Sequence, residues 1–123
     1  MAMRVFQLPF HVTGTLAANV TIIWTAPFDC QLIHVSAVNT AATDGIVRIG
    51  TTTDTDGYLV DSAIGDSSVP NEYDRNDFTG ALITSGQYPH IAKGTVVEIL
   101  VDYDGTGGTA AANLTVVLTL TEG

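Results

Sequence analysis

The sequence predicts an all-β protein, built as a single antiparallel β-sandwich of about seven or eight strands with very little helix. Three observations lead to this prediction. Apolar and polar residues alternate with a period of two, no segment sustains the 3.6-residue period of an amphipathic helix, and β-branched residues and glycine are abundant. We expect a jelly-roll-like arrangement, although strand periodicity by itself does not distinguish it from an immunoglobulin-like sandwich.

The chain length fits one domain. Single hydrophobic cores are typically built from about 100 to 150 residues, and this chain has 123. Residues 1–12 are predicted to form an N-terminal arm or an edge strand, and residues 13–123 the sandwich domain. Pro9 favours a peripheral position for the first segment, because proline has no backbone N–H to donate inside a sheet.

Three further segments alternate in the first half of the chain. Residues 20–26 form a predicted strand that ends at a proline, with Val20, Ile22 and Trp24 on one face. Residues 30–38 form the next, and His34 lies in phase with Cys30 and Leu32, so we expect it to be partly buried and hydrogen-bonded. A shorter strand at residues 46–50 follows an Asp-Gly turn.

The second half contains two strong strands after a weakly patterned stretch. A structureless loop as long as residues 61–93 is unusual in a compact domain, so we expect one or two short strands there. The best candidate is 80–84, with an excursion around 71–77. Residues 95–103 and 114–120 alternate clearly and are joined by a glycine-rich loop of the kind found in hairpins.

The charge balance excludes several partners. Thirteen acidic side chains face four cationic ones, which gives a formal net charge of −9. A nucleic-acid or anionic-membrane binder gains affinity through lysine and arginine, so neither partner is expected. The acidity is read as a solubility feature. No signal-peptide pattern opens the chain, and no apolar run approaches the length that a membrane-spanning helix needs, so we expect folding in a reducing cytoplasm.

No arrangement of residues indicates a catalytic centre. His11, His34 and His90 show none of the spacings of metal-binding histidines, so a small cupin-like enzyme lacks support. Cys30 opens an apolar strand and is expected to be a buried structural thiol. A Cys30–His34 pair would still need an oriented base and an oxyanion site. We expect no enzymatic activity and no cofactor.

One turn has a weak metal-binding pattern. Asp54 and Asp56 precede Gly57, and Asp61 follows, so their carboxylates are candidate calcium ligands. The third ligand and the bidentate glutamate of an EF-hand loop are missing. A plain Asp-Gly turn without metal is therefore the preferred interpretation.

Four aromatic residues lie in or beside predicted loops. Three interpretations are open for them: they cover the ends of the sandwich, anchor a protein interface, or stack on a carbohydrate. These residues are Tyr58, Tyr73, Phe78 and Tyr88.

Three stretches resemble the tailed-phage capsid decoration (cement) proteins of the small jelly-roll or β-sandwich kind. The first runs from Trp24-Thr25-Ala26-Pro27-Phe28-Asp29-Cys30 into residues 31–37. The second runs from Ile91-Ala92-Lys93-Gly94-Thr95 to Asp102-Tyr103-Asp104-Gly105, and the third is the closing segment 111–123. The likeness is an analogy at the level of the fold.

The resemblance implies a structural protein without enzymatic activity. Such a protein binds the outside of an icosahedral phage head after expansion, commonly as a homotrimer at local threefold positions, and clamps neighbouring copies of the major capsid protein. It would be assembled in the host cytoplasm and located on the virion exterior. An N-terminal arm often makes the capsid contact, and the matching residues here are Arg4, Phe6, Leu8 and Phe10.

Trimer formation would bury apolar residues on otherwise polar outward faces of edge strands. The candidates for this subunit interface are Val96, Leu100 and Val117. The alternative function is a carbohydrate- or receptor-binding β-sandwich domain of a virion fibre or tail, with the loop aromatic residues and the Asp54 turn as its site.

Overall fold

The computed structural model describes residues 4–83 and 87–123. This part of the chain contains nine β-strands and no helix, and therefore no helix long and apolar enough to cross a membrane. The all-β prediction is confirmed. The strands are β1 (Val5–Thr15), β2 (Val20–Thr25), β3 (Cys30–Val38), β4 (Ile46–Thr51), β5 (Leu59–Ala63), β6 (Asn71–Tyr73), β7 (His90–Ile91), β8 (Val96–Asp102) and β9 (Ala112–Glu122).

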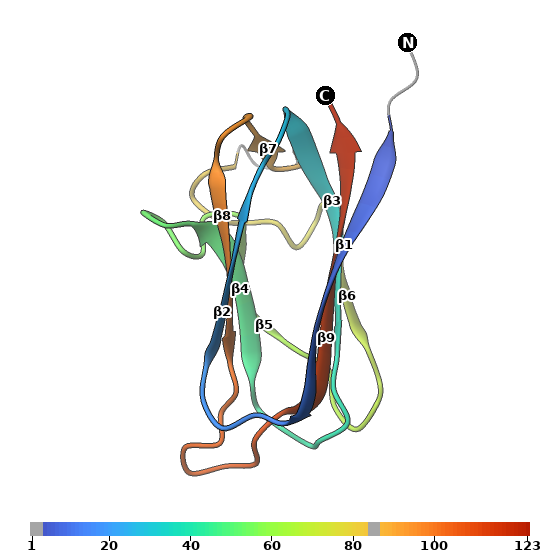
Figure 1. The fold of residues 1–123 in the computed structure, drawn as a ribbon, viewed down its shortest axis with the longest axis vertical. Helices are drawn as coiled ribbons and strands as arrows, with labels where there is room; N and C mark the ends of the chain where they lie inside the picture. Colours follow the sequence, from blue (N-terminus) through green and yellow to red (C-terminus); the bar gives the residue numbers. More distant parts are fainter. Residues whose placement is uncertain (1–3, 84–86) are drawn as a thin grey trace.

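The strands form two antiparallel sheets that face each other (Figure 1). One sheet has the order β1-β9-β3-β6, with β7 also paired to β3, and the other has the order β2-β8-β4-β5. Among the connections, only β4–β5 and β6–β7 stay within one sheet; the others cross between sheets. First and last strands pair side by side, and this order is that of a jelly roll, so the jelly-roll expectation is confirmed.

The core lies between the sheets and is filled from both sides by aliphatic side chains. Strict alternation puts every second residue of β8 and β9 inside, as their patterns predicted. The buried residues of these two strands are Val97, Ile99, Val101, Leu114, Val116, Leu118 and Leu120. Because β8 and β9 are interior strands of opposite sheets, they form the centre of the sandwich.

The connection between β8 and β9 is not the expected hairpin. The glycine-rich loop that suggested a hairpin instead carries the chain from one sheet to the other, and β8 pairs with β2 and β4 while β9 pairs with β1 and β3. Alternation shows which residues of a strand face the core. Those residues are the same whether the two strands pair in one sheet or lie in opposite sheets across the core. Alternation therefore did not distinguish the two cases.

A β-bulge in β3 changes the predicted phase of His34. The pairing of β3 with β9 shifts between Leu32 and His34, so an extra residue enters the strand there. Cys30 and Leu32 are buried before the bulge, Val35 is buried after it, and His34 turns to the outer face. The prediction that His34 shares a face with Cys30 was wrong because a bulge reverses the alternation without a signal in the sequence.

The weakly patterned middle of the chain contains short strands at other positions than expected. β6 occupies part of the predicted excursion at 71–77, and β7 is a two-residue strand. Both add to β3, which supplies the regular partner that such short segments need. Residues 80–83 form a turn rather than the predicted strand, and residue 84 lies outside the described residues.

Loops close the sandwich on the side of β5 and β6. The segment after β6 crosses to the other sheet, where the Leu82 N–H donates to the Gly57 carbonyl at 3.0 Å. Gly80 packs so closely on Gly57 that a Cβ atom at Gly80 would lie 2.1 Å from the Gly57 carbonyl oxygen. Phe78 is buried beneath this segment. This side of the core is therefore covered by the chain itself.

The alternation of β9 gives the first testable prediction. Leu118→Ala removes fully buried methyl groups between the sheets and should lower the free energy of unfolding by about 2–5 kcal/mol. Val117→Thr changes the neighbouring, outward-facing side chain, keeps its β-branch, and should cost less than about 1 kcal/mol. Urea unfolding followed by circular dichroism measures both values, and equal losses would contradict the assigned faces.

Candidate functional site

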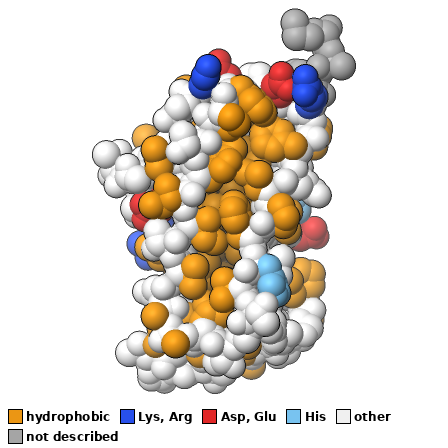
Figure 2. Space-filling model, viewed as in Figure 1, with side chains coloured by type: hydrophobic (Ala, Val, Ile, Leu, Met, Phe, Trp, Pro, Cys, Tyr) orange, Lys and Arg blue, Asp and Glu red, His pale blue; other side chains and the backbone are white. Residues whose placement is uncertain are grey.

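The other side of the sandwich, between β1 and β2, is open. β1 and β2 are the outermost strands of their sheets, and in the view of Figure 1 they lie toward the reader. Figure 2 shows a column of hydrophobic side chains that runs lengthwise between the sheets in this view. We call the half-buried inward-facing residues of these two strands the edge strip; they are Phe6, Leu8, Phe10, Val12, Val20, Ile22 and Trp24.

The N-terminal segment supplies four residues of the edge strip. β1 is paired with β9 from Val5 to Thr15, and Phe6, Leu8 and Phe10 pack against the core at alternate positions. Residues 5–12 are therefore the start of an edge strand that continues past the predicted boundary at residue 12, and they do not form a detached arm. Arg4 forms an exposed ion pair with Glu122, 3.4 Å between Nε and Oε2, which contributes little to stability.

One end of the edge strip is covered by an exposed aromatic residue. Phe28, in the β2–β3 loop, packs edge-to-face on Phe6 with ring centroids 5.4 Å apart. The Phe28 side chain is still 37% exposed. The alternation of the N-terminal segment predicts Phe6 and Phe10 as contact residues, but no pattern places Trp24, Ile22 and Phe28 on the same surface, because the two edge strands come together only in the folded chain.

The predicted subunit-interface residues do not form one surface. Val96 and Leu100 lie on the outer face of the β2-β8-β4-β5 sheet, whereas Val117 lies on the outer face of the other sheet. All three are on interior strands, so their expected position on edge strands was wrong. Ile23 is diagonal to both Val96 and Leu100 across the β2–β8 pairing and is 61% exposed. Ile23 therefore extends an aliphatic patch on that face, which surrounds the carboxylate of Glu98, the residue directly opposite Ile23.

The three candidate calcium ligands are not brought together. Asp54 and Asp56 lie in the β4–β5 loop, where a hydrogen bond between their side chains raises the pKa of Asp54. Asp61 lies on β5 and forms an ion pair with Arg48, with 2.9 Å between Oδ1 and Nε, though without the alignment of a hydrogen bond. The described residues contain no cluster of three or more acidic, histidine or cysteine side chains placed to hold a metal ion.

The histidines and the cysteine are also separated. His11 Nδ1 lies 2.7 Å from the Thr115 hydroxyl, and His34 Nε2 lies 3.6 Å from Glu72, both on the outer face of the β1-β9-β3-β6 sheet. Cys30 is fully buried between the sheets, as predicted. Burial raises the pKa of the Cys30 thiol, and the nearby carboxylate of Asp29 raises it further.

The loop aromatic residues divide into two groups. Tyr58 and Phe78 are buried, and Tyr73 is half-buried with its hydroxyl donating to the Ala63 carbonyl at 2.5 Å. These three residues close the sandwich, as one of the interpretations of the sequence required. Tyr88 is 38% exposed and lines a polar pocket, so it is the member of the group that is placed to contact a ligand.

Comparisons with known proteins give distant structural likenesses. No family model matches the chain, and no curated protein sequence matches it. A chain in the structure of infectious bursal disease virus, Gx strain, is 15% identical with a TM-score of 0.43; the match covers 98% of this chain and 32% of that one. A chain of Desmodium yellow mottle tymovirus is 14% identical with a TM-score of 0.35, covering 99% of this chain and 82% of that one. Similarity this distant assigns no function.

The burial of Cys30 gives a prediction about its reactivity. The thiolate reacts with disulfide reagents, and both burial and the raised pKa keep the native thiolate population low. At pH 7 we expect a chromogenic disulfide to label the native protein roughly a hundredfold or more slower than the urea-unfolded protein, since labelling requires opening of the core. The rate should rise with pH as the thiolate fraction grows. Cys30 is the one cysteine in the sequence, so the signal is unambiguous; equal native and unfolded rates would contradict its placement.

Proposed function

We propose that this protein is a structural component of a virion, specifically a decoration (cement) protein that binds the outer surface of an icosahedral bacteriophage head and stabilises it. The observation that carries the proposal is the edge strip, an apolar surface along one open side of the sandwich. The proposed partner is the major capsid protein. The resemblance of the sequence to phage decoration proteins supports the same function.

The edge strip has the properties of a docking surface for protein. Its residues are half-buried in the isolated chain, so a partner that covers them removes further apolar surface from water, at about 25 cal/mol per Å². Trp24 and the phenylalanines are large side chains of the kind that dominate interface energetics. β1 and β2 are also sheet edges, whose outward backbone groups can pair with a strand of another chain.

The contrast between the two sides of the sandwich favours this surface. On the β5 and β6 side, loops cover the core and bury Phe78 and Ile64. On the β1 and β2 side, the described chain leaves the edge strip half-exposed. A fold that closes one side with its own loops and leaves the other apolar is suited to completion by a partner.

We further propose that the protein acts as a homotrimer on the virion exterior. The aliphatic patch formed by Ile23, Val96 and Leu100 around Glu98 lies on an outer sheet face and is available for contact between copies. Three linked copies bind a symmetric shell with higher avidity than one, without any new kind of contact. Binding to the assembled shell in preference to free capsid subunits stabilises the shell by mass action.

This function requires no bond-making chemistry, so the proposal includes neither enzymatic activity nor a cofactor. A protein with a formal net charge of −9 is also unsuited to hold nucleic acid. Assembly in the host cytoplasm fits a buried cysteine that remains reduced.

The capsid contact is tested at Phe28. Phe28→Asp places a charge on the aromatic pair that ends the edge strip and should weaken binding to expanded heads that lack this protein by roughly thirtyfold, the equivalent of about 2 kcal/mol. Val60→Asp is the matched control, since Val60 is also 37% exposed but lies on β5, at the opposite edge of its sheet. Co-sedimentation over a range of protein concentrations gives both affinities.

Both variants need an unfolding curve, so that weak binding is not confused with poor folding. Undiminished binding of a folded Phe28→Asp variant, or equal loss in both variants, would rule out the edge strip as the capsid contact. If the folded wild-type protein does not bind heads at all, the proposed function is wrong.

The trimer is tested at Ile23. Ile23→Asp places a second carboxylate directly opposite Glu98 and should shift the mass in light scattering from three chains to one, because two like charges without partners are costly to bury at an interface. Val69→Asp is the control, because Val69 is 64% exposed, close to the 61% of Ile23, and lies in the β5–β6 connection. A monomeric wild-type protein, or a trimeric Ile23→Asp variant, would contradict this assignment.

A further inference from the structure

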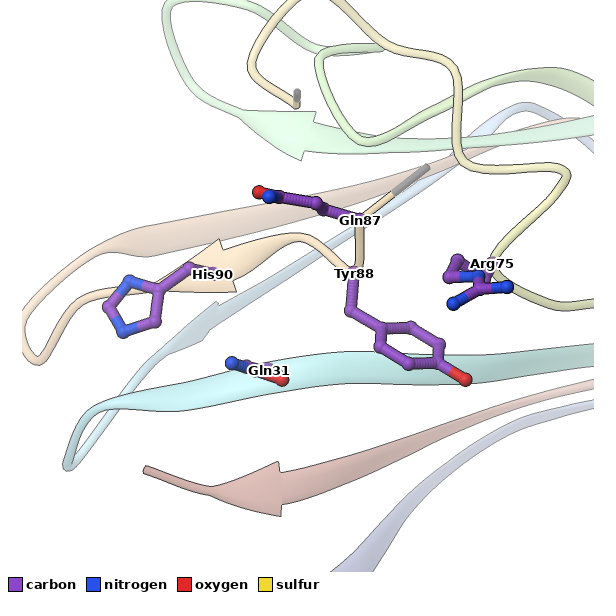
Figure 3. A pocket seen from close by; sticks show the side chains of 5 residues that line it. All are labelled: Gln31, Arg75, Gln87, Tyr88 and His90. Carbon is purple, nitrogen blue, oxygen red and sulfur yellow. The ribbon is translucent and has the colours of Figure 1, made fainter. Parts of the chain in front are cut away.

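A polar pocket lies on the opposite edge of the β1-β9-β3-β6 sheet from the edge strip. Its volume is about 410 Å³. Figure 3 shows the Tyr88 ring extended over β3, with Gln31 and His90 on one side of it and Arg75 on the other. The lining is completed by Gln87. The pocket therefore combines one exposed aromatic ring with four polar side chains.

The fold creates this pocket because two short strands share one edge of β3. β7 pairs with β3 at Cys30 and Gln31, and β6 pairs with β3 further along, from Val35 to Ala37. Between these pairings lies the bulge of β3, where the edge is not continuously covered. Gln31 and His90 are register partners and both point to the outer face, while Arg75 is the second residue after β6.

The electrostatics of the pocket differ from those of the whole chain. In a protein with net charge −9, the five lining residues include an arginine and a histidine but no carboxylate. Within residues 4–83 and 87–123, Arg75 forms no ion pair. Its acidic neighbours Asp74 and Asp77 accept backbone hydrogen bonds from Asn76 and Asp74, respectively. The guanidinium is therefore available for an anionic ligand.

We propose that this pocket binds a sugar that carries a carboxylate. The planar Arg75 guanidinium matches a carboxylate with two parallel hydrogen bonds. Gln31 and Gln87 each offer a donor and an acceptor, which is what sugar hydroxyls require, because a hydroxyl both donates and accepts. The exposed Tyr88 ring supplies an apolar surface for the C–H face of the sugar, and its hydroxyl supplies one further polar contact.

The composition of the pocket disfavours simpler ligands. A small carboxylate alone would use Arg75 but leave the glutamines and the Tyr88 ring without partners. A neutral sugar would use the ring and the amides but leave the guanidinium without a counterion. A ligand that joins a carboxylate to several hydroxyls on a compact ring uses the guanidinium, both amides and the Tyr88 ring together.

The sugar site is independent of the capsid contact in both position and test. β1 lies at one edge of its sheet, and β6 and β7 lie along the opposite edge, so a partner bound at the edge strip leaves the pocket open. Sugar binding can be measured on the isolated protein without phage heads. Failure of one proposal therefore does not affect the other.

The test is a titration of the full chain with sodium glucuronate, with glucose and acetate as separate arms. Calorimetry gives the affinities, and chemical-shift changes in NMR locate the site. We expect glucuronate to bind at least about tenfold more tightly than glucose or acetate, because each of these lacks one class of contact. Shifts should centre on Tyr88 and His90.

Three variants complete the experiment. Arg75→Gln should lower the affinity for glucuronate by about tenfold or more while leaving the weak affinity for glucose unchanged. Tyr88→Ala should weaken glucuronate and glucose together, since both share the ring contact. Lys93→Gln is the charge-matched control, because Lys93 is exposed and lies outside the pocket lining; its affinity should match that of the wild type.

Several outcomes would overturn the proposal. If glucuronate binds no more tightly than acetate, the pocket is not a sugar site. If Arg75→Gln and Lys93→Gln weaken binding equally, the attraction is general electrostatics rather than a contact in the pocket. Shifts confined to residues outside the pocket, or no binding by the folded protein, would also refute it.

Discussion

The structure depends on one constraint: each of two sheets has a single apolar face, and neither face is shielded from water unless the other covers it. The buried leucines of β9 and the buried valines and isoleucine of β8 meet across that interface, and these two strands occupy the middle of their sheets. Because most connections cross between the sheets, nearly all neighbouring strands within a sheet are distant from each other in the sequence.

The same arrangement produces two unlike edges. At the β5 and β6 edge, connections long enough to fold back cover the core with Phe78 and close backbone contacts between Gly57 and Gly80. At the β1 and β2 edge, the two strands are joined by a short connection at one end, and their inward faces remain half-exposed. The covered edge has room for a polar pocket on its outside, whereas the open edge presents an apolar strip. Two kinds of recognition can thus coexist on one small domain.

The candidate surfaces were only partly predictable. Phe6, Leu8 and Phe10 were singled out because they alternate in an apolar N-terminal segment, and that pattern does describe one half of the edge strip. Trp24 and Ile22 were assigned to a strand face without a link to the N-terminus, since nothing in a linear pattern says which strands become neighbours across a sandwich. The polar pocket had no signal beyond Tyr88, because its lining comes from three separate parts of the chain.

The sequence by itself determined the class of fold, most strand positions and the inward residues of β2, β8 and β9, because alternation with a period of two is a local property of a half-buried strand. Tertiary structure alone decided the crossing between β8 and β9, the outward turn of His34, the short strands added to β3, and the separation of Val117 from Val96 and Leu100. Each of these depends on which strand lies beside which. That choice is made by contacts between residues distant in the chain, which leave no periodic trace in it.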